Sequence, residues 1–240
     1  MQQQEQEIRA LVFDVFGTLV DWRGSIAREA RLVLAPLGLD RLDWEAFADA
    51  WRGEYQGAMA EVRSGRLPFA KLDALHRRNL DLVLRRWGLD ARVDETIRVR
   101  LNLAWHRLDA WPDVGAGLRL LRQRYLLAPC SNGHIALMVA LARRNAWHWD
   151  AILGAEIARD YKPKPGVYLA AAAALDLAPA QLMMVAAHAD DLAAARAAGL
   201  RTAFVARPDE AGPGRGEGQP AGPVDLAAED LMALAAALGA

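Results

Sequence analysis

The chain has 240 residues, of which 53% are hydrophobic and 25% are charged, and its formal net charge is −1. This composition excludes an intrinsically disordered chain, and the length suits one large domain or a core with a smaller second domain. Because 29 basic residues almost balance 30 acidic ones, the charge argues against nucleic acid as a partner.

Cysteine content and the start of the chain bear on the cellular compartment. Cys130 is the only cysteine, so no intramolecular disulfide can form. The opening MQQQEQEIRA is polar and unlike a signal peptide, and no run approaches the roughly 20 apolar residues that span a membrane. We expect a soluble, cytoplasmic protein that has no membrane partner.

Short apolar runs that read as buried strands alternate with helical segments along most of the chain. The expected strands are residues 10–14, 125–131, 151–157, 182–187 and 201–206. Apolar residues recur at helical spacing in residues 115–124, 167–177 and 190–200. This alternation predicts an α/β fold with a mostly parallel sheet that is covered by helices on both faces.

Residues 23–111 interrupt the alternation, because they are helical in period and contain no strand candidate. A helical block inserted after the first strand predicts a cap over the strand ends. We expect a core domain of residues 6–22 and 112–240 and a cap domain of residues 23–111. Residues 207–225 are rich in Gly and Pro and predict a loop or mobile segment, and residues 226–240 predict a final helix.

Polar side chains follow the expected strands where each strand ends. In an open parallel sheet, ligands bind beyond the carboxyl ends of the strands. The residues expected at that edge are Asp14, Thr18, Ser131, Asn132, Lys162, His188, Asp190 and Asp191. A carboxylate, a cation, a further acid and small hydrogen-bonding groups at one edge predict a catalytic site. Asp190 is interpreted as a helix-capping or surface residue.

Four segments resemble, in order, the signature segments of the haloacid dehalogenase-like hydrolase superfamily. They are FDVFGTLVDW with Asp14 as the nucleophile, CSNGH with Ser131, YKPKPGVY with Lys162, and VAAHADDLAAARAAGL with Asp191. The resemblance covers nearly the full length and implies a Rossmann-like parallel sheet core with an inserted helical cap domain.

The first and fourth segments depart from the pattern of the superfamily's phosphatases. Those enzymes carry Asp-x-Asp in the first segment, with the second Asp as general acid, and Phe16 stands at that position here. An acid of the fourth segment helps them to bind magnesium, and Ala187 stands there here. Because Mg²⁺ requires several oxygen ligands, we expect neither a metal nor any other cofactor.

At these positions the chain resembles the L-2-haloacid dehalogenase subfamily, which has an aromatic residue in place of the second acid. This resemblance implies an (S)-2-haloacid dehalogenase with a small-molecule 2-haloacid as its substrate, and often a homodimer. It assigns halide or substrate binding to Phe16, Arg52, Asn132 and Tyr168. The alternatives to Arg52 lie in the same helical block and are Arg63, Arg66, Arg77 and Arg78.

The resemblance also implies a two-step reaction. Asp14 attacks C2 of the substrate with inversion and forms an aspartyl ester, which a water positioned by Asp191 then hydrolyses. Lys162 keeps Asp14 ionised, since a neighbouring cation favours the charged form. Ser131 or Thr18 contacts the substrate carboxylate.

The fourth segment reads AAHADD where better-known dehalogenases have Ser-Ser-Asn-Ala-Trp-Asp. His188 then provides an additional hydrogen-bond donor for the departing halide or the attacking water. The AAH form resembles a branch that includes enzymes acting on fluorinated haloacids, so fluoroacetate is a further hypothetical substrate.

Three other functions stay open from the sequence. A phosphatase would need magnesium and a phosphomonoester. A metal-independent hydrolase could act on another small 2-substituted acid, such as a strained cyclic imino acid. A non-enzymatic binding module is disfavoured because Asp14, Lys162 and Asp191 are all present.

Overall fold

A computed structural model of the chain describes residues 7–240 and divides into two compact units. The core unit is the chain up to Asp21 together with Asp109–Ala240, and the helical unit is Trp22–Leu108. The cap domain expected from the sequence, residues 23–111, begins one residue later and ends three residues later than the helical unit of the structure. The helices of the described residues are all too short or too polar to cross a bilayer.

The core unit contains a parallel sheet of six strands in the order β5-β4-β1-β6-β7-β8. The strands are β1 (Ala10–Phe13), β4 (Leu126–Ser131), β5 (Leu153–Gly154), β6 (Leu182–Ala186), β7 (Arg201–Val205) and β8 (Leu226–Ala228). In register, Phe13 at the end of central β1 lies beside Pro129 of β4 and Val185 of β6. The carboxyl ends of these three strands therefore open on one edge, and the predicted α/β fold is confirmed.

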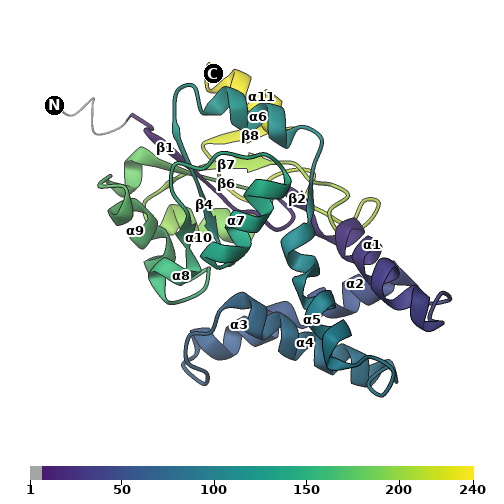
Figure 1. The fold of residues 1–240 in the computed structure, drawn as a ribbon. Helices are drawn as coiled ribbons and strands as arrows, with labels where there is room; N and C mark the ends of the chain where they lie inside the picture. Colours follow the sequence, from purple (N-terminus) through teal and green to yellow (C-terminus); the bar gives the residue numbers. More distant parts are fainter. Residues whose placement is uncertain (1–6) are drawn as a thin grey trace. The chain divides into compact units, whose positions relative to one another are not determined.

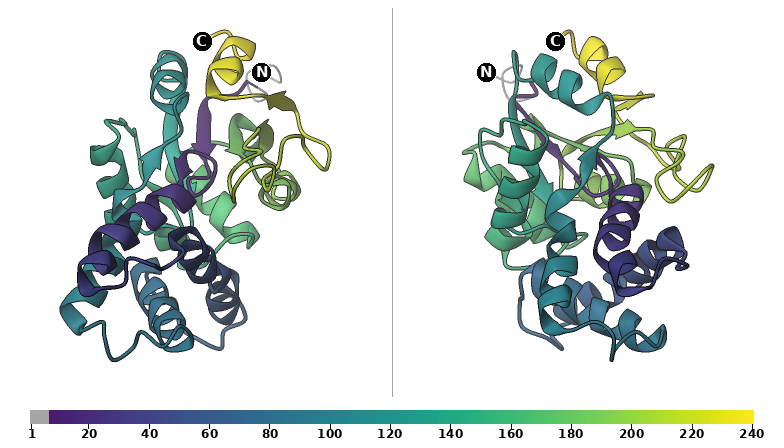
Figure 2. Two further views of the ribbon diagram at one scale, coloured as in Figure 1. Left: turned by 90° about the vertical axis from the view of Figure 1, so that its right-hand side faces the viewer. Right: turned by 45° about the vertical axis from the view of Figure 1, so that its right-hand side comes forward.

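Helices cover both faces of this sheet (Figure 1). The helices are α6 (Val114–Leu121), α7 (Ile135–Arg144), α8 (Ala155–Ala158), α9 (Pro165–Ala174), α10 (Ala189–Ala197) and α11 (Leu231–Ala237). Apolar side chains of α9 and α10 form one buried cluster with Val12 of β1, Cys130 of β4 and Met184 of β6. Figure 2 shows α6 beside α11, and a Cβ on Gly117 would lie 2.5 Å from the Leu231 side chain.

Three expectations about the core elements are wrong in part. The expected strand 151–157 ends at Gly154, and α8 follows at once. A Cβ on Gly154, whose φ is +111°, would lie 2.2 Å from the Ser131 carbonyl oxygen, so this residue is adapted to a close backbone contact. The expected helix 226–240 begins with strand β8, because pairing with β7 overrides the helix propensity of its alanines.

The third difference lies at the end of the block without strand candidates. Strand β3 (Asp109–Ala110) pairs antiparallel with β2 (Val20–Asp21). Both strands are only two residues long and belong to the core unit, where the chain leaves that unit and returns to it. Two residues are too few for a periodicity to indicate a strand.

The helical unit is built around buried aromatic side chains. Its helices are α1 (Trp22–Leu34), α2 (Trp44–Gly53), α3 (Tyr55–Arg63), α4 (Leu72–Arg86) and α5 (Glu95–Asn102). The side chains of Asp43 and Asp94 accept hydrogen bonds from backbone amides and cap the amino ends of α2 and α5. Trp51 packs edge-on against Trp105, which stacks on His76 at 4.1 Å between ring centroids.

Candidate active site

The turn after β1 places Asp14 and Thr18 at the carboxyl edge of the sheet. The Asp14 backbone amide still donates to Val185 of β6, which holds Asp14 level with the strand ends. The chain then turns back, since the amides of Leu19 and Val20 both donate to the Val15 carbonyl. Gly17 makes this turn possible with a φ of +89°, which side chains rarely allow.

Three side chains donate to or pair with the Asp14 carboxylate, which is only 9% exposed. Lys162 Nζ lies 2.9 Å from Oδ1, and Thr18 Oγ1 donates to Oδ2 at 2.8 Å. His188 Nδ1 lies 3.2 Å from the same Oδ2. Burial alone would raise the pKa of Asp14, but the charges of Lys162 and His188 outweigh it and hold this pKa well below its usual range. Asp14 is therefore a buried carboxylate that is ionised at neutral pH.

Lys162 links the two acids of the site. Its Nζ also donates to Asp191 Oδ2 at 2.5 Å, and its side chain is 6% exposed. Burial disfavours the charged ammonium, but Asp14 and Asp191 together raise the pKa of Lys162 well above its ordinary value. Lys162 is thus a cation at every physiological pH.

Asp191 lies in the first turn of α10 and receives a second donor from α9. The Tyr168 hydroxyl donates to Asp191 Oδ1 at 2.5 Å, and the tyrosine is fully buried. Burial raises the pKa of Asp191, and the nearby charge of Asp14 raises it further against the opposing effect of Lys162. Tyr168, assigned above to substrate or halide binding, is placed behind Asp191 and fixes the orientation of that carboxylate.

The small polar residues shape the backbone around these charges. Ser131 Oγ, which is fully buried, accepts from the Gly133 amide at 3.0 Å. Asn132 Oδ1 accepts from the Lys162 amide at 2.8 Å, so the Asn132 NH₂ group is the part left to meet a ligand. Thr18 Oγ1 accepts from the Ala187 amide at 2.9 Å while it donates to Asp14. These residues hold the turns after β1, β4 and β6 together.

His188 is held by both ring nitrogens. Its Nε2 lies 2.8 Å from Glu210 Oε2, while Nδ1 faces Asp14. Burial would lower the pKa of His188, but the two carboxylates raise it to about 10. Sequence reasoning missed Glu210, because it lies in the Gly- and Pro-rich segment after β7 and no local pattern distinguishes it from a solvated loop acid.

The donor set at this edge does not fit a magnesium ion. Phe16 is 2% exposed and offers a hydrocarbon ring, and Ala187 offers no side-chain oxygen. The oxygens of Asp14 and Asp191 already face the cations Lys162 and His188 and the hydroxyls of Thr18 and Tyr168. An octahedral shell of oxygen ligands cannot be assembled from these groups.

Arg52 belongs to the helical unit, at the end of α2. Its guanidinium carbon lies 4.0 Å from the centroid of the Tyr55 ring and 5.3 Å from that of Trp22, which orients it by cation–π contacts. Two of the alternative arginines are engaged by carboxylates: Arg77 pairs with Glu95 and Arg78 with Glu61. Arg52 stays the halide-binding arginine as a prediction.

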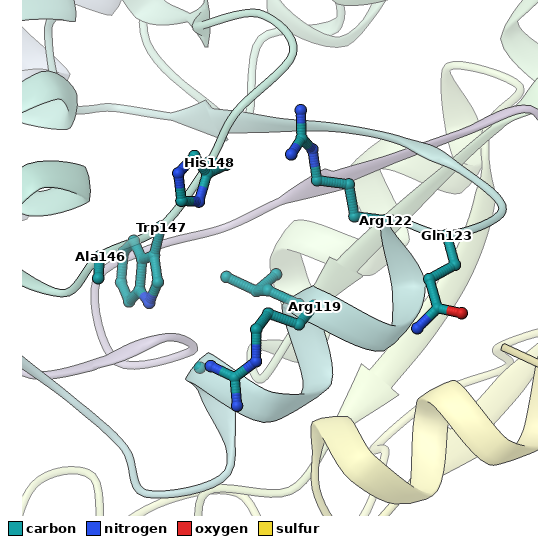
Figure 3. Close-up of a pocket in the computed structure, with 8 residues that line it drawn as sticks. Arg119, Arg122, Gln123, Ala146, Trp147 and His148 are labelled. Atoms are coloured by element: carbon teal, nitrogen blue, oxygen red, sulfur yellow. The ribbon is translucent and has the colours of Figure 1, made fainter.

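A hollow of about 480 Å³ in the core unit lies apart from these residues. Figure 3 shows Arg119, Arg122, Gln123, Ala146, Trp147 and His148 along it. Arg122 and Gln123 lie four and three residues before the start of β4 at Leu126, so this part of the hollow lies near the amino end of that strand. None of the predicted site residues lines it.

Comparisons with known proteins relate the chain to one family of hydrolases. A family model described as haloacid dehalogenase-like hydrolase matches residues 8–199. The (S)-2-haloacid dehalogenase 4A of Burkholderia cepacia is 30% identical over 203 residues, which are 83% of this chain and 84% of that protein. A phosphoglycolate phosphatase of Chromobacterium violaceum is 31% identical over 197 residues, which are 81% of this chain and 83% of that protein.

Two solved structures cover almost the whole chain. The defluorinating L-2-haloacid dehalogenase Rha0230 is 44% identical with a TM-score of 0.94, and the alignment covers 97% of this chain and 96% of the other. The L-2-haloacid dehalogenase PA0810 is 45% identical with a TM-score of 0.92, with coverage of 97% and 99%. The resemblance read from the four segments is confirmed, and the chain belongs to the haloacid dehalogenase-like hydrolase family.

Proposed function

We propose that the protein is an (S)-2-haloacid dehalogenase that converts small 2-haloalkanoic acids into 2-hydroxy acids. The observation that carries the proposal is the Asp14 carboxylate, ionised between Lys162 and His188, beside Phe16 where a phosphatase has its general acid. A halide leaves as an anion and needs no proton. A buried carboxylate nucleophile with Phe16 in place of the phosphatases' general acid is suited to that leaving group.

In the first step, one Asp14 oxygen forms a bond to C2 of the substrate from the side opposite the halogen. The carbon–halogen bond breaks, its electron pair leaves with the halide, and C2 is inverted. Lys162 orients Asp14 for this attack through its contact with Oδ1. The Asn132 NH₂ group and Arg52 are proposed to receive the halide.

In the second step, water attacks Cγ of the Asp14 ester and the bond from Cγ to the ester oxygen breaks. One water proton goes to the departing 2-hydroxy acid, and the other passes to Asp191 and then to solvent. Burial raises the pKa of Asp191, which makes it a better proton acceptor, although Asp14 is a neutral ester at this stage and no longer contributes its charge. Lys162 and Tyr168 hold the Asp191 carboxylate in place meanwhile.

One feature supports fluoroacetate as one of the substrates, namely a relative named as defluorinating that is 44% identical over nearly the whole chain. The His188 donor expected from the sequence is not available to the departing fluoride, because both ring nitrogens face carboxylates.

A phosphatase is the second candidate, since a phosphoglycolate phosphatase is 31% identical over 81% of this chain. Phosphoryl transfer requires metal ions or other cations to neutralise the phosphoryl oxygens. The donor set around Asp14 does not fit magnesium, which weighs against this candidate.

Halide release from (S)-2-chloropropionate in excess EDTA tests the proposal, with Asp14→Asn as the control. We expect chloride at enzyme-like turnover from the wild type and a loss of about 10³-fold or more in Asp14→Asn. Fluoroacetate is assayed next under the same conditions. Absence of chloride, together with phosphate release from a phosphomonoester once magnesium is added, would overturn the proposal in favour of the phosphatase.

A further inference from the structure

We propose that Glu210 is a positioning residue that acts on the nucleophile through His188. Its carboxylate holds the imidazole so that Nδ1–H points at Asp14 Oδ2. The assignment of a catalytic step to this arrangement rests on the proposed function, whereas the arrangement itself rests on geometry alone.

The three side chains form a continuous chain of short contacts. Glu210 Oε2 lies 2.8 Å from His188 Nε2, and His188 Nδ1 lies 3.2 Å from Asp14 Oδ2. The exposed fractions of the side chains are 12% for Glu210, 30% for His188 and 9% for Asp14. An imidazole that faces a carboxylate at each nitrogen is satisfied only when both nitrogens carry a proton. Glu210 therefore keeps His188 as an imidazolium.

The segment that carries Glu210 is tied down on both sides. The Arg207 guanidinium, 7% exposed as a residue, makes two hydrogen bonds to Asp113 and donates to the Thr18 carbonyl. The Arg207 amide donates to the Glu217 carbonyl, which closes residues 207–217 into a loop. The Glu217 carboxylate accepts from the Ala189 amide, next to His188. The loop expected from composition is thus an ordered part of the site.

The turn that follows the nucleophile has room for Glu210. A Cβ placed on Gly17 would lie 2.0 Å from Glu210 Oε1. The missing side chain therefore lets the Glu210 carboxylate lie directly against the turn that carries Asp14. Arg207 donates to the Thr18 carbonyl of the same turn, so two separate contacts join the loop to the turn that follows the nucleophile.

The charges around His188 agree with this arrangement. Asp14 and Glu210 face the ring directly, Lys162 lies on the far side of Asp14, and Glu217 lies at the adjacent Ala189 amide. Burial would lower the pKa of His188, but Asp14 and Glu210 raise it to about 10. Removal of the Glu210 charge should leave Asp14 as the sole direct anionic partner and bring this pKa towards its ordinary value of 6.5.

The arrangement serves the second step of the reaction. When Oδ1 attacks the substrate, Oδ2 becomes the carbonyl oxygen of the ester, and it already faces Thr18 and His188. Attack of water places negative charge on this oxygen. A fixed imidazolium N–H stabilises that charge without reorganisation, while His188 keeps its proton throughout.

The test compares the wild-type chain of 240 residues with Glu210→Gln and with the matched control Asp209→Asn. Asp209 is the exposed neighbour of Glu210 in the same loop, and its carboxylate accepts from the Gly214 amide. NMR titration of the His188 ring, assigned with His188→Gln, should give a pKa near 10 in the wild type and in Asp209→Asn. In Glu210→Gln we expect a value lower by at least about one pH unit. Equal values in Glu210→Gln and the wild type overturn the proposal.

The kinetic arm follows the ester by mass spectrometry after rapid mixing with (S)-2-chloropropionate. Glu210→Gln should accumulate a covalent adduct on Asp14 and show a burst of chloride followed by turnover at least about tenfold slower. A slower reaction without adduct would overturn the assignment to the second step.

If the wild type releases no halide, the proposed function fails and the titration alone decides the role of Glu210. If Glu210→Gln does not fold, Glu210→Asp, which withdraws the carboxylate by one methylene, takes its place with an intermediate pKa expected.

Discussion

The charge cluster at the sheet edge of the core unit and the Arg86–Glu54 pair of the helical unit join basic and acidic side chains in opposite surroundings. At the carboxyl edge of the sheet, Asp14, Lys162 and Asp191 are each less than 10% exposed and share hydrogen bonds. In the helical unit, Arg86 pairs with Glu54 while 61% and 26% of these side chains are exposed. A pairing of opposite charges is therefore surrounded by protein in the first case and largely by water in the second.

The difference in exposure distinguishes charges that support reactivity from a pair that lies on the surface. Buried charges lose their hydration, and their mutual attraction only partly offsets that loss. Such a cluster is kept for what it does to the pKa values of its members, whereas an exposed pair is screened and contributes little. Three variants test this contrast, from the largest expected effect to the smallest.

Lys162→Met should have the largest effect on stability and activity together. It leaves Asp14 and Asp191 facing each other without the cation between them, and breaking a buried pair in this way typically costs ~3–5 kcal/mol. Urea unfolding at pH 7 measures the loss, and chloride release should fall below detection. Lys164→Met, an exposed lysine two residues away, is the control and should match the wild type. Wild-type stability in Lys162→Met at pH 7 would contradict this account.

His188→Gln should have an intermediate effect that depends on pH. The pKa of His188 rises from 6.5 to about 10 in the folded chain, so the imidazolium stabilises the fold fully below about pH 6.5. This contribution falls as pH rises and is lost near pH 10. The free energy of unfolding of the wild type should exceed that of His188→Gln by roughly 2 kcal/mol at pH 6, allowing for partial exposure of the ring. The difference should be much smaller at pH 10. A difference independent of pH in urea unfolding would refute the charge assignment.

Arg86→Ala should have the smallest effect. Its partner Glu54 remains partly hydrated after the change, so the free energy of unfolding should fall by less than ~0.5 kcal/mol. Chloride release should be unchanged. A loss above ~1 kcal/mol would show that the exposed pair is structurally more important than its surroundings suggest.

The strands of the main sheet and the residues at their ends were largely predictable. Leu11, Val12 and Phe13 form a short apolar run that ends at Asp14, and similar runs precede Ser131 and Ala187. A strand buried on both faces has this composition whatever surrounds it. Elements governed by a partner were not predictable, as β8 and the two-residue strands β2 and β3 show, because their pairing is decided by neighbours distant in the sequence.

The sequence was sufficient to bring Asp14, Lys162 and Asp191 to one edge, since the order of strands and helices in a parallel sheet dictates where the strand ends meet. Only the tertiary structure decided what each charge touches. Three contacts join residues that are far apart in the sequence. Tyr168 donates to Asp191, Glu210 orients His188, and the Glu210 carboxylate lies against Gly17. Composition and periodicity describe the chain one segment at a time, whereas a pKa depends on charges that folding brings within a few ångströms.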